Sequence, residues 1–198
     1  MPRTRPAPLS RELPDAGTMR RRARAGMCVV AALLVVPFAV GGLAQGSWSG
    51  PVAGLVVCSF GFLYDEVFQE RPPARHSATR ITARTLTGVR SVDLDHITSV
   101  RLWTTCSYGV LCRTVLVRDV HGVRLGVTST AGRRALRRAL KRRMADGTER
   151  PPRVSRAASA YLRNGPRRHL AVHTVLVFFA ELGFIIVYLS ALFATAAM

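Results

Sequence analysis

The stretch that decides the class of this protein is LAVHTVLVFFAELGFIIVYLSALF, residues 170–193. It holds no arginine or lysine and a single acidic residue, Glu181. A bilayer core of about 30 Å needs about 20 predominantly apolar helical residues. Residues 170–193 therefore predict a membrane-spanning helix, and Arg167, Arg168 and His169 stand directly before it.

A second uncharged region, residues 25–64, predicts two further spans. The first is GMCVVAALLVVPFAVGGLAQ, residues 26–45, and the second continues to Phe68 after the residues GSWSGP at positions 46–51. Gly, Ser and Pro at such a density favour a turn over a continuous helix. We therefore expect a transmembrane helical hairpin over residues 26–68.

A cleaved signal peptide is the alternative for the first of these spans. A basic segment, an apolar segment and the small residues from Gly42 to Ala44 fit the pattern of such a peptide. A second apolar run begins within a few residues of that cleavage site. This arrangement favours the hairpin over a mature N-terminus.

The charge of the chain lies outside these apolar segments. Its 198 residues carry a net charge of +18, with 28 arginines and a single lysine, a bias typical of bacterial genomes of high GC content. Loops rich in arginine and lysine stay in the cytoplasm. Residues 1–25 form a basic tail, the loop at 45–51 is uncharged, and residues 71–168 are rich in arginine. We expect a multi-pass protein of the plasma membrane, with its N-terminus and middle domain in the cytoplasm and its C-terminus outside.

The middle domain, residues 71–147, has the pattern of a small antiparallel β structure. Apolar and polar residues alternate, which is the period of half-buried strands. Turn signals at Thr87-Gly88 and His121-Gly122 separate neighbouring strands. Five strands are expected, at residues 81–86, 89–94, 97–102, 113–120 and 123–127.

A helix is expected after these strands, over residues 131–145. Ser129 or Thr130 can cap it, because a side-chain oxygen there accepts a free N–H of the first turn. Its apolar stripe consists of Leu136, Leu140 and Met144, flanked by alanines. The chain is therefore expected to be an α+β membrane protein.

Three stretches of the middle domain resemble the bacterial pleckstrin-homology-like (PH-like) domains of small membrane proteins. They are RITARTLTGVRSVDLDHITSVRLWTT, RTVLVRDVHGVRLGVTS and AGRRALRRALKRRM, which together cover about residues 79–145. The resemblance implies a strongly bent antiparallel sheet that a C-terminal helix closes at one end. It also implies a module for binding or assembly, with no reaction of its own.

Residues 148–169 are expected to connect this domain to the last span. They contain a short helix over residues 154–162 that ends at Asn164-Gly165-Pro166. This connector either lies on the membrane surface or is solvated, and its composition favours a solvated tether. On the membrane, its inward side chains would be Val154, Ala158, Tyr161 and Leu162.

Motifs of enzymes are missing from the sequence. It has no phosphate-binding loop, no dinucleotide-binding glycine motif after a strand, no HExxH and no nucleophile elbow. Cys106 and Cys112 lack the spacing of a structural zinc site, and His96 and His121 are expected to be exposed turn residues. We therefore expect no catalytic residues, no metal and no cofactor.

The expected helix is strongly basic, and this surface is the first candidate binding site. An anionic membrane surface attracts basic residues held close to it, by about 1 kcal/mol each. An acidic protein partner and a merely solvated face are the alternatives, while nucleic acid is disfavoured because no interleaved aromatic residues accompany the charge. The candidate residues are Arg133, Arg134, Arg137, Arg138, Lys141 and Arg142.

Glu181 is the second candidate, because an ionised acid near the middle of a bilayer needs a partner or a proton. A protonated Glu181 can hold helices together, for example in a homo-oligomer. The alternative is a small oligomeric transporter or sensor. The sequence thus favours a non-enzymatic, membrane-anchored binding or scaffold module over a transporter.

Overall fold

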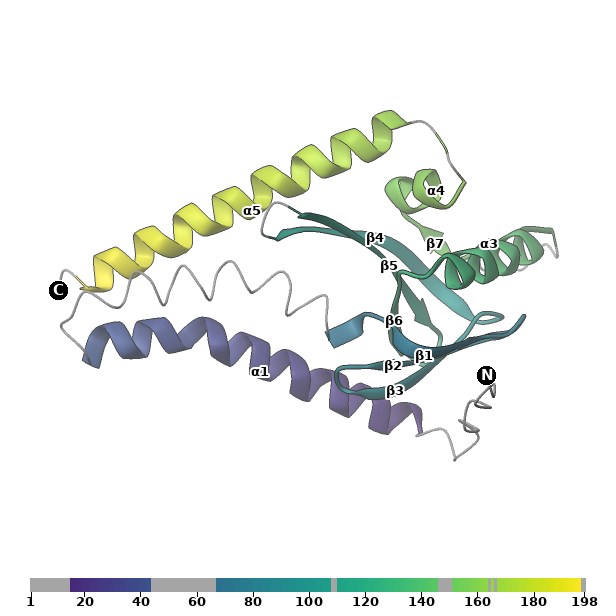
Figure 1. Cartoon of the computed structure of the whole chain (residues 1–198), viewed down its shortest axis with the longest axis horizontal. Coiled ribbons are helices and arrows are strands. Elements are labelled where there is room, and N and C mark those ends of the chain that lie inside the picture. The colour runs from purple at the N-terminus through teal and green to yellow at the C-terminus, as the bar shows by residue number, and fades with distance from the viewer. Residues whose placement is uncertain are drawn as a thin grey trace, which may run out of the picture.

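The computed structural model describes residues 15–43, 67–107, 110–145, 151–163, 165 and 167–196. The elements in chain order are α1 (Ala16–Leu43), β1 (Arg71–His76), β2 (Arg80–Thr85), β3 (Gly88–Asp93), β4 (Ile97–Ser107), β5 (Val110–Asp119), β6 (Arg124–Val127), α3 (Thr130–Ala145), β7 (Arg153–Val154), α4 (Arg156–Arg163) and α5 (Arg167–Ala196). Helices and mostly antiparallel strands are combined, as the sequence predicts (Figure 1).

The strands form two sheets, with the orders β1-β2-β3 and β6-β5-β4-β7. Leu86 and Thr87 form the turn between β2 and β3, and Gly88 follows with a φ of +116°, which glycine adopts without steric strain. Asp119 Oδ1 accepts the backbone N–H of Val123 at 2.9 Å across the turn between β5 and β6. Each expected hairpin is therefore present.

All five expected strands are present, and two further strands were not expected. β4 and β5 extend beyond the predicted residues to form a long hairpin. β1 contains Pro72 and Pro73 and pairs with a strand on one side only, which is where a sheet tolerates proline. β7 is two residues long and pairs in parallel with β4.

A shared hydrophobic core joins the two sheets to α3. Ser129 caps this helix, because its Oγ accepts the N–H of Gly132 at 3.0 Å; this confirms one of the two expected caps. Met144 was expected on the apolar stripe but is 55% exposed, so the stripe ends at Leu140. The core includes Ile81, Val92, Val115, Leu125, Leu136, Ala139 and Leu140.

The connector after α3 is part of this core, and the prediction of a solvated tether is wrong. Ala158 and Leu162 of α4 are 0% and 2% exposed and belong to the core. Val154 of β7 and Tyr161 pack against it. The sequence placed the apolar side chains of this helix on one face correctly, but their partners are core residues of the domain.

The basic tail is also partly built into the fold. α1 begins at Ala16, ten residues before the expected start of the first span, and Met19 is buried in the core of the domain. Farther along α1, Val30 packs against Val67 and Phe68, which come shortly before β1. The rest of the expected hairpin, residues 44–66, lies outside the described residues, so the hairpin stays a prediction.

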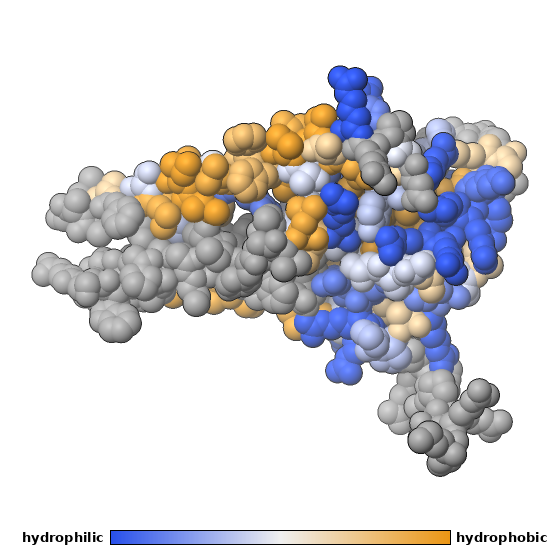
Figure 2. All heavy atoms as spheres, turned by 45° about the horizontal axis from the view of Figure 1, so that its top comes forward, coloured by the Kyte–Doolittle hydropathy of each residue, from blue (hydrophilic) through white to orange (hydrophobic). Residues whose placement is uncertain are grey.

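One described helix is long and apolar enough to cross a membrane, the part of α5 at Arg168–Ala191, with a mean hydropathy of 2.3. α1 and α5 contact each other and extend from the same end of the β structure (Figure 1). Figure 2 shows apolar side chains gathered at this helical end and hydrophilic ones at the opposite end.

Candidate functional site

The basic helix α3 presents four cationic side chains on its exposed surface. Arg134, Arg137, Arg138 and Lys141 are exposed and make no hydrogen bond or ion pair with another described residue. We call these four residues the basic helix surface. They lie within two turns of one helix, and no described acidic residue neutralises them, so the surface attracts anions.

Two of the six predicted residues on this helix have structural contacts instead. The guanidinium of Arg133 lies 5.3 Å from the ring centroid of Tyr161, and its Nη1 donates a hydrogen bond of 2.6 Å to the Tyr161 hydroxyl. Arg142 Nη2 donates to the carbonyl oxygen of Ala78 and lies 3.6 Å from Asp95 Oδ1. Arg133 and Arg142 therefore fix α3 to α4 and to the loops of the sheets.

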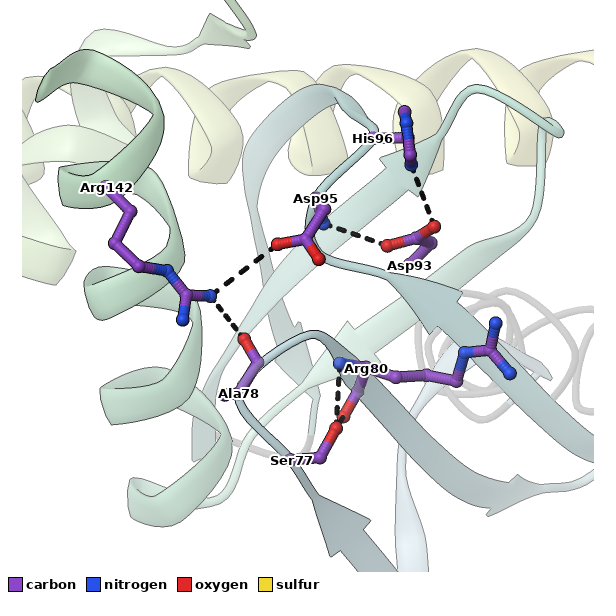
Figure 3. A network of polar contacts seen from close by, with 7 residues as sticks. All are labelled: Ser77, Ala78, Arg80, Asp93, Asp95, His96 and Arg142. Atoms are coloured by element: carbon purple, nitrogen blue, oxygen red, sulfur yellow. Dashed lines mark hydrogen bonds and ion pairs between the residues drawn. The ribbon is translucent and has the colours of Figure 1, made fainter. Parts of the chain in front are cut away.

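Figure 3 shows the contacts of Arg142 beside a second polar cluster on the same loop. Asp93 Oδ2 lies 2.9 Å from His96 Nδ1, and Asp93 Oδ1 accepts the backbone N–H of Asp95 at 2.9 Å. Partial burial raises the pKa of Asp93, but the hydrogen bonds and the positive charges of His96 and Arg80 outweigh it and leave this pKa below the ordinary value. The loop that receives Arg142 is therefore held in place by an ionised Asp93.

The basic helix surface lies far from the free ends of α1 and α5. α3 is at the end of the β structure opposite to the side from which these two helices extend (Figure 1). A membrane around the apolar part of α5 would therefore face the other end of the domain. The sequence could not reveal this, because the pattern of α3 does not specify its position relative to a span.

Glu181 lies in the candidate membrane helix and is half-buried. Arg113 Nη2 of β5 donates a hydrogen bond of 3.4 Å to Thr174 Oγ1, so the first two turns of α5 lie beside the second sheet. Glu181 follows Thr174 by seven residues, which corresponds to about 10 Å along a helix. Glu181 is the twelfth of the 24 residues expected to span the membrane, so it lies at the middle of that span.

The structure also brings together five arginines that the sequence analysis did not single out. Arg20 and Arg24 from α1, Arg90 from β3, Arg118 from β5 and Arg124 from β6 line one cavity, which we call the arginine pocket. Arg90 could have been found from the alternation of its strand. It shares a face with Val92 and Leu94, both in the core, and strand residues two positions apart point the same way.

Histidines, cysteines and acids are the side chains that most often bind metal ions. No group of three histidines, cysteines or acids lies close enough to hold a metal ion among the described residues. His96 and His121 are exposed in their turns, as expected. Cys112 is half-buried and not disulfide-bonded.

Comparisons with known proteins give no relative from which a function could be transferred. No protein-family model, no curated protein and no solved structure matches the chain. The resemblance to PH-like domains therefore stays a prediction from the sequence. What is established for the described residues is an α+β structure with largely antiparallel sheets and one helix long and apolar enough to cross a membrane.

Proposed function

We propose that this protein is a non-enzymatic, membrane-anchored binding module that presents the basic helix surface to an acidic protein partner. The observation that carries the proposal is a set of four exposed cations on α3 that have no ion-pair partner among the described residues. Arg133 and Arg142 hold this helix against the domain, so the charges are displayed on a fixed support. A fixed array loses less side-chain entropy on binding than a flexible tail would.

The position of α3 favours a protein partner over the membrane surface. We place the membrane around α5 and the apolar half of α1. α3 then faces the cytoplasm from the far end of the domain (Figure 1). Attraction to an anionic leaflet falls off within a Debye length, about 10 Å at 0.1 M salt. A soluble protein with an acidic surface can diffuse to α3, so the distance between α3 and the leaflet does not limit its binding.

The order of strands and helix in the domain supports a likeness to PH-like domains. Strands β1 to β6, which pair antiparallel within the two sheets, precede α3, and α3 packs its apolar face on their shared core. We therefore include a PH-like architecture in the proposal. Such a domain holds a binding surface rigidly and needs no catalytic group.

Binding of a fluorescein-labelled polyglutamate peptide tests the proposal. The full-length protein is placed in nanodiscs of neutral phosphatidylcholine, and fluorescence anisotropy measures the affinity. We expect binding that weakens as salt rises, because screening shortens to about 3 Å at 1 M. Replacing Arg134, Arg137, Arg138 and Lys141 together with Gln should weaken it at least about tenfold.

A matched variant removes four charges elsewhere on the exposed surface. Arg21, Arg84, Arg101 and Arg153 are exposed, and their replacement with Gln lowers the net charge equally. An equal loss of affinity in both variants would mean that net charge alone attracts the peptide, which contradicts the proposal. Tighter binding to anionic vesicles than to the peptide would instead assign α3 to a membrane surface.

The alternative function, an oligomeric transporter or sensor, has one observation in its favour. Glu181 lies in a helix whose most apolar window is not buried in the chain (0%), so a second copy has access to its surface. This alternative requires a flux that depends on Glu181, and the measurement that separates the two functions follows in the Discussion.

A further inference from the structure

The arginine pocket has a volume of about 430 Å³ and lies where α1 meets β3, β5 and β6. Its five arginines come from four different elements, and none of the described residues that line it is acidic. Like charges repel at this distance, and the repulsion is stronger where protein excludes water. Four of the five are exposed, so water screens part of this repulsion, and an anion bound among them would neutralise the rest.

Arg90 lies at the base of this pocket and is the only buried arginine of the five. Its side chain is 2% exposed. Its Nη1 donates to the carbonyl oxygen of Arg124 at 2.9 Å, and its Nη2 donates to Thr87 Oγ1. Its Nε has no hydrogen-bond partner among the described residues. Buried charges in proteins are normally paired with an opposite charge, and no described acid pairs with Arg90.

The surroundings of Arg90 show the strain of this burial. Desolvation lowers the pKa of Arg90 to about 10, and its guanidinium lies 4.9 Å from the ring centroid of Phe68. The attraction between a cation and an aromatic face replaces part of the stabilisation that the cation had in water. The Phe68 ring carries no negative charge, so Arg90 can still pair with a negatively charged ligand.

Arg20 and Arg118 come together at the turn between β5 and β6. An added Cβ on Gly122 would lie 3.5 Å from Cδ of Arg20 and 3.7 Å from Nη2 of Arg118. These are ordinary van der Waals distances, so both side chains lie over the same turn. Guanidinium groups that converge in this way match the oxygens of a phosphate, which they bind with two parallel hydrogen bonds each.

One wall of the pocket is apolar and leads toward the apolar half of α1. Ala23, Met27 and Phe68 line it, with Cys28 of α1 beside them. Val29, Leu33, Val35 and Val36, which follow on α1, are exposed apolar residues. A ligand with a phosphate at one end and a hydrocarbon chain at the other fits this sequence of surfaces.

We propose that the arginine pocket binds the phosphate group of an anionic phospholipid from the leaflet next to the domain. The inference rests on the membrane anchoring in the proposed function, and it does not depend on the basic helix surface. Arg20, Arg118 and Arg124 contact the phosphate at the rim, Arg90 faces it from below, and the acyl chains follow α1 into the bilayer. A soluble phosphate compound carries the same charge but has no hydrocarbon chain to contact the apolar wall.

The test measures binding of short-chain lipids to the full-length protein in a neutral detergent. Isothermal titration calorimetry gives affinities for dihexanoyl phosphatidylglycerol, dihexanoyl phosphatidylcholine and inorganic phosphate. We expect the anionic lipid to bind at least about tenfold more tightly than the other two. It should also raise the unfolding temperature, because a ligand of the folded state stabilises that state.

Two matched double variants locate the site. Arg118→Gln with Arg124→Gln removes two charges at the pocket rim and spares the buried Arg90, so the fold is retained. It should lower the affinity for the anionic lipid at least about tenfold. Arg84→Gln with Arg101→Gln removes the same charge from exposed positions outside the pocket and outside the basic helix surface, and should leave the affinity within about twofold.

Three results would overturn the inference. These are no binding of the anionic lipid, equal binding by the two double variants, or inorganic phosphate that binds as tightly as the lipid; the last would assign the pocket to a soluble phosphate compound. Carbonate extraction of native membranes checks anchoring separately. A protein that stays in the membrane and binds polyglutamate but not the lipid would leave the proposed function intact and reject only the lipid site.

Discussion

The Oε1 atom of Glu70 accepts a hydrogen bond from the backbone N–H of Thr128 at 3.0 Å. The same oxygen accepts the N–H of Ser129, and Oε2 lies 3.3 Å from His76 Nε2. Glu70 precedes β1 and Thr128 follows β6, so this buried carboxylate joins both ends of the β structure where α3 begins. A negative charge at that position is also favoured by the helix dipole.

Replacing Glu70 with Ala should lower the free energy of unfolding by about 1 to 3 kcal/mol, because it leaves two partly buried backbone N–H groups without an acceptor. Glu70→Gln keeps one oxygen and should cost less. Chemical denaturation of the full-length protein in detergent, followed by circular dichroism, measures both. Equal stability of the Ala variant and the parent would show that water replaces the carboxylate.

Arg133 should act in folding and not in binding. Its bond to Tyr161 connects α3 to α4, and a hydrogen bond to a charged group contributes about 1.5 to 3 kcal/mol. A double-mutant cycle of Arg133→Gln and Tyr161→Phe should therefore show coupling in the unfolding free energy. Arg133→Gln alone should leave polyglutamate affinity nearly unchanged, whereas a loss as large as that of Arg137→Gln would place Arg133 in the binding surface.

Asp93 should make stability depend on pH in the acid range. The pKa of Asp93 in the fold is below its ordinary value of 3.8, so the ionised form stabilises the fold. This contribution is fully present above pH 3.8 and is lost as the pH falls through the lower pKa of the folded state. The unfolding temperature of Asp93→Asn should fall less steeply than that of the parent over this range. Asp95→Asn, which keeps the Asp93 carboxylate, is the control.

Labelling of single cysteines should report the topology. In a background with Cys28, Cys58, Cys106 and Cys112 replaced by Ser, a membrane-impermeant maleimide should label Ala194→Cys on intact cells. It should label Arg134→Cys only after permeabilisation, because the topology we propose places the basic domain in the cytoplasm. The opposite pattern would invert the topology. An N-terminal tag retained in the membrane fraction would support the hairpin, and its early loss would support a signal peptide.

Glu181 should hold copies of the protein together without conducting an ion. Glu181→Gln should reduce the cross-linked oligomer in detergent, because a protonated acid in an apolar environment donates a hydrogen bond that keeps helices in contact. Proton flux into liposomes, measured with a pH-sensitive dye, should be the same for parent and variant. Ser190→Ala is the control on the same helix. A flux that the Glu181 substitution abolishes would favour the transporter.

The sequence predicts those parts of the fold that depend on local patterns. Ile81, Ala83 and Thr85 are buried at alternate positions of β2, as their spacing predicts. Leu136 and Leu140 lie one turn apart on α3 and both reach the core. In each case the side chains that are buried together are close in sequence, so the periodicity of apolar residues is sufficient to predict their burial.

The parts that could not be predicted depend on contacts between distant segments. Ala158 and Met19 are both in the core, although 139 positions separate them, and neither segment is strongly apolar. The arginine pocket combines α1 with three strands for the same reason. Polar composition predicted solvent exposure for these segments, but long arginine side chains cover apolar surface while their charged ends reach solvent or a ligand.

The continuity of α1 gives the domain a fixed rotational phase relative to any membrane that holds the helix. Met19 is locked in the core of the domain, and the same 28-residue helix continues to Leu43. Each helical residue turns the chain by about 100°. One alanine inserted after Cys28 would therefore swing the domain by about 100° about the helix axis, while four would return it to within about 40°. The rotation of the domain relative to the bilayer is therefore set by the helical phase of α1.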